Sequence, residues 1–339
     1  MPPEASLSFL SLSLTTRVPM LSYWKHKLTK LRTDKNPKRW DALTTHQAPH
    51  KPFLLLAIMD LMEAGRITEN RIEPSLELVD AFTGYWRKLF PVGKTSTMAY
   101  PFPRLQSDGV LVLIPLPGIP QPIPPGNIHS LHKLRSCYSH ACLDDHLYVL
   151  MQGAESREIL RTDLISHYFA EAIRAEIQGE SRVNRLSAQY THYLLDKGTL
   201  TPDEIKEVTT TRIVRDRGFR GALLPEYDHR CAICKVRVRT PEEHHVVDAA
   251  HIVPFAETRN NELTNGLSLC KLCHWAFDEG MLGIDKNHKI LVSSHMRAAG
   301  NSAAHLIGLE HRPIVEPVHP LYTPGGENLA WHRREVFLR

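Results

Sequence analysis

Hydrophobic and polar residues in the first half of the chain mostly follow helical spacing. The apolar run Phe53–Met62 comes after Pro52 and stops before Gly65, which is typical of a buried core helix with these residues at its ends. Leu76–Phe90 has the spacing of an amphipathic helix. Arg157–Ile177 is also helical in pattern, and we expect it to close a first domain.

Other segments are less regular. Val110–Ile114 has the composition of a buried strand, and Pro115–Pro125 contains six prolines, which predict a stiff connecting loop. Ser22–Trp40 is basic and contains aromatic residues, so we expect a helix and a loop with a cationic face. Gly179–Arg220 is charged and partly helical, which fits either a basic arm or a solvated charged helix.

A different order of elements is predicted further along the chain. Val246–Val253 is rich in β-branched and small residues, which predicts a short strand that ends at Pro254. A turn at 265–266 leads into a second apolar stretch, Leu267–Leu269. Leu272–Gly280 then has helical spacing with a glycine at its end. Together these segments predict a strand–loop–strand–helix unit, or ββα.

Composition sets broad limits on the protein. A chain of 339 residues should hold two or three domains, and 42% hydrophobic residues suffice for globular cores. No apolar run reaches the ~20 residues that cross a bilayer, so we expect no membrane partner. The first 20 residues lack the basic start of a secretory signal. We therefore expect a disordered leader, or a start site placed upstream of Met20. We also expect the protein to be cytoplasmic.

Cysteines provide the first candidate chemistry. Four of the six form two C-x-x-C pairs, namely Cys231 with Cys234 and Cys270 with Cys273. Four thiolates are the ligand set of a closed tetrahedral zinc site. Two disulfides are the alternative, but paired C-x-x-C motifs without a secretory signal favour a structural Zn²⁺. Cys137 and Cys142 are not part of a C-x-x-C motif, so we expect them to be ordinary thiols.

Several motifs around these cysteines occur in a characteristic order. They are Cys231-x2-Cys234, Asp248-Ala249-Ala250-His251-Ile252, Asn265-Gly266-Leu267 and Cys270-x2-Cys273-His274-x2-Phe277-Asp278. This segment resembles an HNH endonuclease of the ββα-metal type. In that resemblance His251 is the first histidine, Asn265 the asparagine and His274 the last histidine. It implies metal-dependent DNA hydrolysis that leaves 5′-phosphate and 3′-hydroxyl ends.

The chemistry of phosphodiester hydrolysis suits those residue types. A histidine that titrates near neutral pH can take a proton from the attacking water, and His251 is the candidate base. One divalent cation, Mg²⁺ or Mn²⁺, must stabilise the charge on the phosphate and the leaving oxygen, and His274 is its candidate ligand. Asn265 would orient the base or hold the loop.

Two aspartates are weaker candidates for the same site. Asp248 is a possible further metal ligand, although many HNH relatives carry a ligand directly before the base, where this chain has Ala250. Asp278 lies one helical turn after His274 and would be its hydrogen-bonding partner.

A second resemblance concerns the N-terminal half. The stretches Ala48–Leu56 and Ala99–Leu105 resemble the sulfur-binding domain that precedes the HNH domain in phosphorothioate-dependent type IV restriction endonucleases. This resemblance implies a DNA-contacting pocket built from five residues, which are His50, Lys51, Tyr100, Pro101 and Arg104. An apolar wall favours sulfur, because burying an oxygen anion without hydrogen-bond partners costs several kcal/mol.

Basic residues before this pocket predict contacts to the DNA backbone that do not depend on sequence. They are Arg32, Lys35, Lys38 and Arg39. The formal net charge of +4 does not by itself indicate nucleic-acid binding, because local clustering of charge matters more.

We therefore expect an α+β restriction endonuclease specific for phosphorothioated duplex DNA. The predicted parts are a disordered leader (1–20), a sulfur-binding domain (21–178), a basic helical linker (179–220), an HNH domain (221–300) and a tail packed on it (301–339). Cutting both strands predicts a homodimer or successive nicks. The alternatives are an HNH endonuclease directed to methylated or unmodified DNA, and a non-catalytic zinc-stabilised DNA-binding protein.

Overall fold

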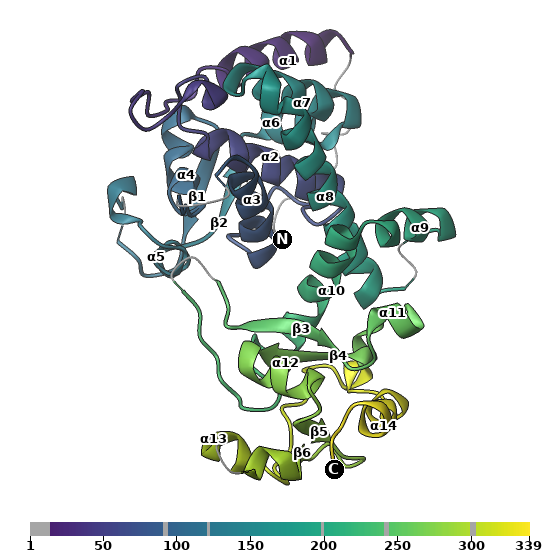
Figure 1. The fold of residues 1–339 in the computed structure, drawn as a ribbon. Coiled ribbons are helices and arrows are strands. Elements are labelled where there is room, and N and C mark those ends of the chain that lie inside the picture. The colour runs from purple at the N-terminus through teal and green to yellow at the C-terminus, as the bar shows by residue number, and fades with distance from the viewer. Residues whose placement is uncertain (1–13, 91–93, 121–122, 198–199, 241–243, 299–302) are drawn as a thin grey trace, which may run out of the picture. The chain divides into compact units, whose positions relative to one another are not determined.

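The computed structural model describes residues 14–90, 94–120, 123–197, 200–240, 244–298 and 303–339 (Figure 1). It divides into two units, Met1–Arg185 and Leu186–Arg339, which we call unit 1 and unit 2. Residues 1–13 of the predicted leader lie outside the described part, and residues 14–20 belong to a helix. No helix in the described part is both long and apolar enough to span a membrane.

Unit 1 is mainly helical, as expected. Its helices are α1 (Leu14–Leu28), α2 (His50–Glu63), α3 (Leu76–Leu89), α4 (Pro101–Arg104), α5 (Leu131–Cys137), α6 (Asp145–Gln152), α7 (Ala154–Tyr168) and the first part of α8 (Glu171–Leu195). Its strands β1 (Leu111–Pro115) and β2 (Tyr138–Leu143) pair antiparallel. The strand β2 was not predicted, because its sequence Tyr-Ser-His-Ala-Cys-Leu contains no β-branched residue.

Helix α2 forms the centre of unit 1. Every residue from Lys51 to Met62 is buried, and α2 contacts α3, α4, α6 and α7. The helix ends at Glu63, and Gly65 follows with a positive φ of 70°. This conformation is open to glycine at little cost, so the predicted helix stop is confirmed.

The predicted single helix Arg157–Ile177 is wrong. Helix α7 ends at Tyr168, Phe169 has an extended backbone, and α8 starts at Glu171. The break is explained by two contacts. The Phe169 ring is fully buried and stacks on Phe53 at 5.0 Å, and the next backbone N–H donates to the carbonyl of Leu43 at 2.9 Å.

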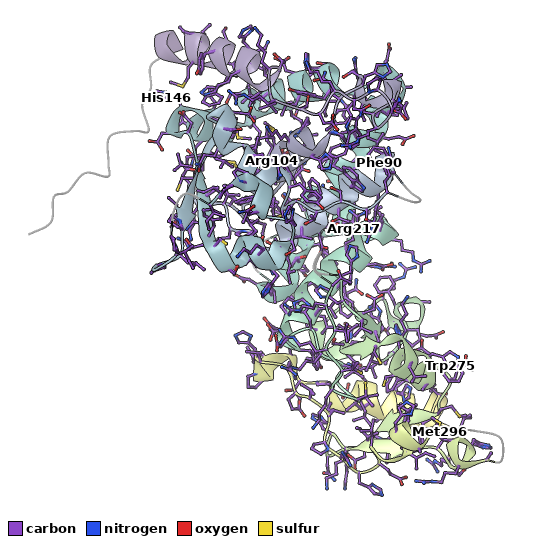
Figure 2. All side chains as sticks on the ribbon, turned by 90° about the vertical axis from the view of Figure 1, so that its left-hand side faces the viewer. Phe90, Arg104, His146, Arg217, Trp275 and Met296 are labelled. Carbon is purple, nitrogen blue, oxygen red and sulfur yellow. The ribbon has the colours of Figure 1, made fainter. Side chains whose placement is uncertain are left out.

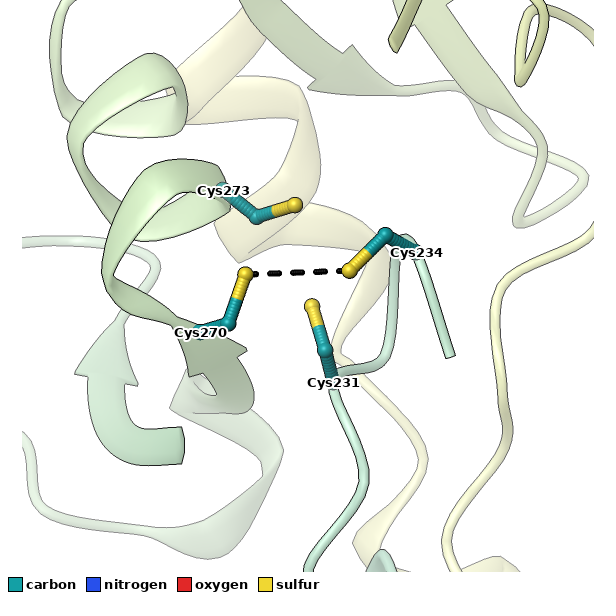
Figure 3. A group of neighbouring side chains, drawn as sticks. All are labelled: Cys231, Cys234, Cys270 and Cys273. Atoms are coloured by element: carbon teal, nitrogen blue, oxygen red, sulfur yellow. Dashed lines mark hydrogen bonds between the residues drawn. The ribbon is translucent and has the colours of Figure 1, made fainter. Parts of the chain in front are cut away.

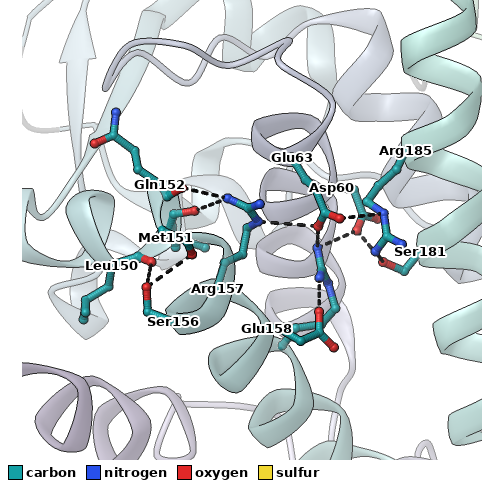
Figure 4. Close-up of polar contacts among 12 residues, drawn as sticks. Asp60, Glu63, Leu150, Met151, Gln152, Ser156, Arg157, Glu158, Ser181 and Arg185 are labelled. Carbon is teal, nitrogen blue, oxygen red and sulfur yellow. Dashed lines mark hydrogen bonds and ion pairs between the residues drawn. The ribbon is translucent and has the colours of Figure 1, made fainter. Parts of the chain in front are cut away.

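A buried cluster of charges joins α2, α7 and α8 (Figure 4). Arg161 donates to Glu63 at 2.6 Å and lies 3.5 Å from Asp60, which also accepts a hydrogen bond from Ser181 at 2.5 Å. Arg185 makes a further ion pair with Glu63 at 3.1 Å. Burial raises the pKa of Asp60 to about 6, although Arg161 and the hydrogen bonds oppose that shift.

Replacing Arg161 by methionine should destabilise unit 1 by ~3–5 kcal/mol, because the buried carboxylate of Asp60 would lose its cation and Glu63 would lose one of its ion pairs. Urea unfolding followed by circular dichroism measures this change. Arg71→Met is the control. Arg71 pairs with Glu73 at 2.8 Å on the surface, so its loss should cost less than about 1 kcal/mol. Equal effects of the two substitutions would contradict a structural role of the buried cluster.

Unit 2 contains the end of α8 and a mixture of short strands and helices. The helices are α9 (Pro202–Thr210), α10 (Arg212–Glu226), α11 (Phe255–Thr258), α12 (Lys271–Asp278), α13 (Ala304–Ile307) and α14 (Gly326–Glu335). The strands are β3 (Val247–His251), β4 (Gly266–Cys270), β5 (Leu282–Ile284) and β6 (Ile290–Val292). Residues 186–220, expected as a linker, fall within this unit.

The predicted ββα unit is confirmed. Strands β3 and β4 pair antiparallel, with His251 opposite Gly266 and Val247 opposite Cys270, and α12 begins directly after β4. The second strand pair, β5 with β6, is also antiparallel. In Figure 1, β3, β4 and α12 lie side by side.

Helix α10 packs closely on β3, on β4 and on the end of α8. A side chain on Gly218 would meet the Tyr190 ring at 2.7 Å, and one on Gly266 of β4 would meet Phe219 and Leu223 at 2.8 Å. These two glycines therefore allow backbones to approach where any larger residue would collide. Close packing brings α10 directly beside the end of β3.

The C-terminal segment covers the ββα unit. His332 on α14 stacks on Phe277 of α12 at 3.6 Å and donates from Nε2 to the Phe277 carbonyl at 2.9 Å. Burial lowers the pKa of His332 to about 4, so its ring stays neutral inside the core. Val318 donates to the carbonyl of Glu226 at 2.7 Å, which ties the segment before α14 to α10.

Candidate functional site

The four paired cysteines converge in unit 2 (Figure 3). Their sulfur atoms all lie within 4.8 Å of one another, and the Sγ atoms of Cys234 and Cys270 are 3.6 Å apart. A tetrahedral ion with metal–sulfur bonds of ~2.3 Å would hold its sulfurs about 3.8 Å apart. All six cysteines are free thiols. The donor set therefore fits one metal ion and does not form the alternative pair of disulfides.

Local backbone geometry builds this cluster. The first C-x-x-C lies in a turn in which Cys231 accepts from the N–H of Lys235 and donates to the carbonyl of Val236, both at 2.9 Å. Lys235 has a positive φ of 65°. The N–H of Ala232 bonds to the carbonyl of Ser268 at 2.7 Å, which attaches this turn to β4. The second pair spans the junction of β4 and α12.

His251 is the last residue of β3, and its ring contacts Phe219 and Asn261. Its ring stacks on Phe219 of α10 at 4.3 Å with an interplanar angle of 8°. Its Nε2 lies 2.7 Å from Oδ1 of Asn261. Burial lowers the pKa of His251, while the Asn261 hydrogen bond and Asp216 partly oppose that shift. The imidazole is thus neutral at neutral pH, which a proton acceptor requires.

Asn265 bonds to the loop between β3 and β4. Its Oδ1 accepts from the N–H of Val253 at 2.9 Å, and its Nδ2 donates to the carbonyls of Val253 and Asn260, each at 3.0 Å. The side chain is fully buried. Of the two roles considered for Asn265, these contacts correspond to holding the loop.

Asn261 makes the side-chain contact to the histidine, and sequence reasoning missed it. It lies in a polar stretch with no periodicity or motif to mark it. Its Nδ2 donates to the Tyr190 hydroxyl at 2.9 Å. Only the fold brings these residues to His251.

His274 and Asp278 lie on α12, with Nε2 and Oδ2 3.5 Å apart. Burial raises the pKa of Asp278, and the charge of His274 opposes this. Asp248 is 3.2 Å from Nε of Arg220 and is largely exposed. Among the described residues, the cysteine cluster is the one group of three or more potential ligands that lie close together, so neither His274 nor Asp248 belongs to such a group.

An open cleft of about 950 Å³ lies at the end of β3. His251, Phe219 and Asp248 line it, together with four arginines of α10: Arg212, Arg215, Arg217 and Arg220. Arg215 lies over the Phe255 ring at 3.8 Å. Four cations face two carboxylates here, those of Asp248 and Asp216, so the cleft attracts anions. Figure 2 draws these side chains and labels Arg217.

Unit 1 has a smaller pocket of about 270 Å³. All five residues predicted for sulfur recognition line it, as do two of the four predicted backbone contacts: His50, Lys51, Tyr100, Pro101, Arg104, Arg32 and Arg39. Lys35 and Lys38 are exposed residues outside this lining. Trp40 and Asp34 also line the pocket and were not predicted. Arg104 is labelled in Figure 2.

Aromatic rings surround His50 in this pocket. Its ring is 5.3 Å from Trp40, 4.7 Å from Trp86 and 6.3 Å from Tyr100. Burial, and then the nearby charge of Arg104, lower the pKa of His50 to about 4. His50 is therefore a neutral part of the pocket wall at neutral pH.

The charge of Lys51 is compensated inside the protein. Its ammonium donates to Asp108 at 2.5 Å and to the carbonyl of Arg32 at 2.7 Å, and the side chain is buried. Arg104 donates to the carbonyl of Tyr100 at 2.7 Å, which holds its guanidinium against the start of α4. The cations at the pocket that are not buried are Arg32, Arg39 and Arg104.

Comparison with known proteins identifies one domain. Residues 231–285 match the family described as HNH endonuclease, so this part of unit 2 is an HNH endonuclease domain. Among solved structures, a "Modification dependent TagI restriction endonuclease" is 22% identical with a TM-score of 0.26, over 35% of this chain and 37% of that protein's length. The search of curated proteins found no match.

Proposed function

We propose that the protein is a restriction endonuclease that hydrolyses phosphodiester bonds in the cleft of unit 2. The observation that carries this proposal is the position of His251. This residue lies within the HNH endonuclease domain, and its neutral imidazole lines a cleft that also contains the arginines of α10. A non-catalytic DNA-binding protein would need the arginines but not a histidine with these properties.

The residues of the cleft and two residues of α12 have complementary roles in this proposal. His251 takes the proton of the attacking water. The arginines of α10 bind the phosphates on either side of the cut and concentrate anionic DNA in the cleft. A bound Mg²⁺ or Mn²⁺ would stabilise the charge that develops on the phosphate and the leaving 3′ oxygen. His274 would hold this single ion with Asp278 as its partner, and Asp248 is a second candidate ligand.

The cysteine cluster would hold a structural Zn²⁺. Its four thiolates leave no coordination position for water, which is the arrangement of structural and not catalytic zinc sites. Because the cluster joins the turn at 231–235 to the start of α12, a bound ion would fix the helix that carries His274.

The pocket of unit 1 would direct cutting to phosphorothioated duplex DNA. Sulfur is larger, more polarizable and a weaker hydrogen-bond acceptor than oxygen. A wall of Trp40, neutral His50, Tyr100 and Pro101 suits sulfur, because an oxygen anion there would lack hydrogen-bond partners. Arg32, Arg39 and Arg104 at the pocket balance the remaining charge of the phosphorothioate.

Matched phosphorothioated, methylated and plain duplexes, incubated with the protein and Mg²⁺ or Mn²⁺, test this function. We expect preferential binding and cutting of the phosphorothioated duplex. Equal cutting of all three would reject the sulfur pocket and keep the nuclease, and preference for methylated DNA would favour a methyl-directed enzyme. A nicked-plasmid intermediate, or a dimer in analytical ultracentrifugation, distinguishes successive nicking from a homodimer.

Tyr100→Ala should reduce the preference for phosphorothioated over plain duplex by about tenfold, which corresponds to ~1.4 kcal/mol. Tyr100 is 39% exposed, so its loss should leave the fold intact. Lys38→Ala is the matched control. It should weaken the binding of both duplexes equally. It should also reduce the slope of log binding constant against log salt concentration by about one. Fluorescence anisotropy titrations at several salt concentrations measure both effects, and an unchanged preference in Tyr100→Ala contradicts the assignment.

A further inference from the structure

Asn261 is placed to determine the state of the His251 ring. Its side chain is buried, with 6% of its surface exposed, between two polar partners. The Oδ1 atom is 2.7 Å from Nε2 of His251, and the Nδ2 atom donates to the Tyr190 hydroxyl at 2.9 Å. Tyr190 lies on α8, and only 3% of it is exposed.

The hydrogen bond to Asn261 fixes which ring nitrogen carries the proton. An amide oxygen only accepts hydrogen bonds, so Nε2 of His251 must be the donor. In a neutral imidazole the lone pair is then on Nδ1. Stacking on Phe219, with the two rings only 8° from parallel, holds the ring plane in place.

We propose that Asn261, held by Tyr190, is a positioning residue that keeps the proton of neutral His251 on Nε2 and leaves Nδ1 to accept the proton of the attacking water. This inference rests on the proposed nuclease function. The charged and titratable groups that act on the ring are Asp216, Arg215 and His274. The atom 2.7 Å from Nε2 belongs to the neutral side chain of Asn261 and not to any of these groups.

The proton transfer in this arrangement is balanced. An O–H bond of water breaks, and its proton binds to Nδ1, which gives an imidazolium with protons on both nitrogens. The water oxygen bonds to phosphorus as the bond to the 3′ oxygen breaks, and the leaving oxygen takes a proton from solvent. Asn261 accepts from Nε2 throughout, so it stabilises the imidazolium without receiving a proton.

Nitrogen-15 NMR of histidine-labelled protein tests the ring state without relying on activity. The chain contains 20 histidines, so the His251 signals are assigned by their absence from His251→Gln. Above its pKa, His251 should show a protonated Nε2 and an unprotonated Nδ1. An unprotonated Nε2 would overturn the proposal, because it would require Asn261 to donate from its amide nitrogen.

Kinetics of Asn261 variants provide the second test. Asn261→Ala should lower kcat about 10–100-fold with little change in KM. Its NMR spectrum should show His251 as a mixture of the forms protonated on Nε2 and on Nδ1. Asn261→Asp keeps the acceptor and adds a negative charge, so it should shift the acid side of the kcat–pH profile to higher pH. Tyr190→Phe should give a smaller loss than Asn261→Ala.

Asn260→Ala is the control, because Asn260 is a neighbouring, half-buried residue whose side chain accepts only from the N–H of Glu262, at 2.8 Å, among the contacts described. It should retain the wild-type rate and pH profile. Wild-type kcat and an unchanged ring state in Asn261→Ala would reject the inference. If the wild-type protein cuts no DNA, the proposed function fails, and the NMR result still decides whether Asn261 fixes the ring.

Discussion

Replacing His251 by glutamine should lower the DNA cleavage rate by a factor of about 10²–10⁴ while leaving DNA affinity nearly unchanged. Glutamine keeps a polar side chain near Asn261 but cannot take the proton of water at neutral pH. The arginines of α10, which are proposed to bind the phosphates, are unchanged in this variant. Cleavage under single-turnover conditions and anisotropy binding in the same buffer separate these two effects.

The pH dependence of cleavage gives an independent check on His251. Only the neutral ring accepts a proton, so the rate should fall as pH falls through the pKa of His251. Burial lowers that pKa, so the loss should occur below the usual histidine range. His305→Gln is the control, because His305 is exposed on α13 and far in sequence from the cleft. Equal loss of activity in both variants would contradict the role given to His251.

If the cysteine cluster holds the proposed structural zinc, removing that metal should unfold the ββα unit. Binding of structural zinc contributes ~10–16 kcal/mol in small zinc domains, which exceeds the stability of most domains. Cys273→Ser removes a ligand that is fully buried, and a strong chelator removes the ion. Both treatments should expose unit 2 to proteolysis, and Cys273→Ser should also abolish cleavage when Mg²⁺ or Mn²⁺ is supplied.

Metal analysis and a second cysteine variant sharpen this test. Mass spectrometry of the purified protein should find one zinc per chain in the wild type and none in Cys273→Ser. Cys142→Ser is the control, because Cys142 lies in unit 1, outside the cluster. A wild type without bound metal, or a Cys273→Ser variant as stable as Cys142→Ser, would show that the cluster is not a structural metal site.

Local patterns were enough to predict the parts of the site that depend on neighbouring residues. The two C-x-x-C motifs predicted that four cysteines lie together, and alternation and turn residues predicted the ββα unit; both predictions are confirmed. The core helix α2 was predicted from its apolar run and the glycine after it. Each of these depends on contacts within a few residues or on a strong ligand preference.

Long-range contacts account for what the sequence did not reveal. Tyr190 and Asn261 are 71 residues apart, so no local pattern predicts their hydrogen bond. Phe219 and His251 are also far apart in sequence, and their rings stack only in the folded chain. The buried pairing of Lys51, a predicted DNA contact, with Asp108 joins residues 57 apart in sequence, and no local pattern indicates it.

Isotope labelling of the product tests the central claim most directly. The protein is incubated with duplex DNA and Mg²⁺ or Mn²⁺ in water enriched in oxygen-18, and the fragment ends are examined by mass spectrometry. We predict one oxygen-18 atom on the new 5′-phosphate, an unlabelled 3′-hydroxyl, and almost no product from His251→Gln. Intact DNA under all conditions, or label on a 3′-phosphate, would contradict water attack in the cleft of unit 2.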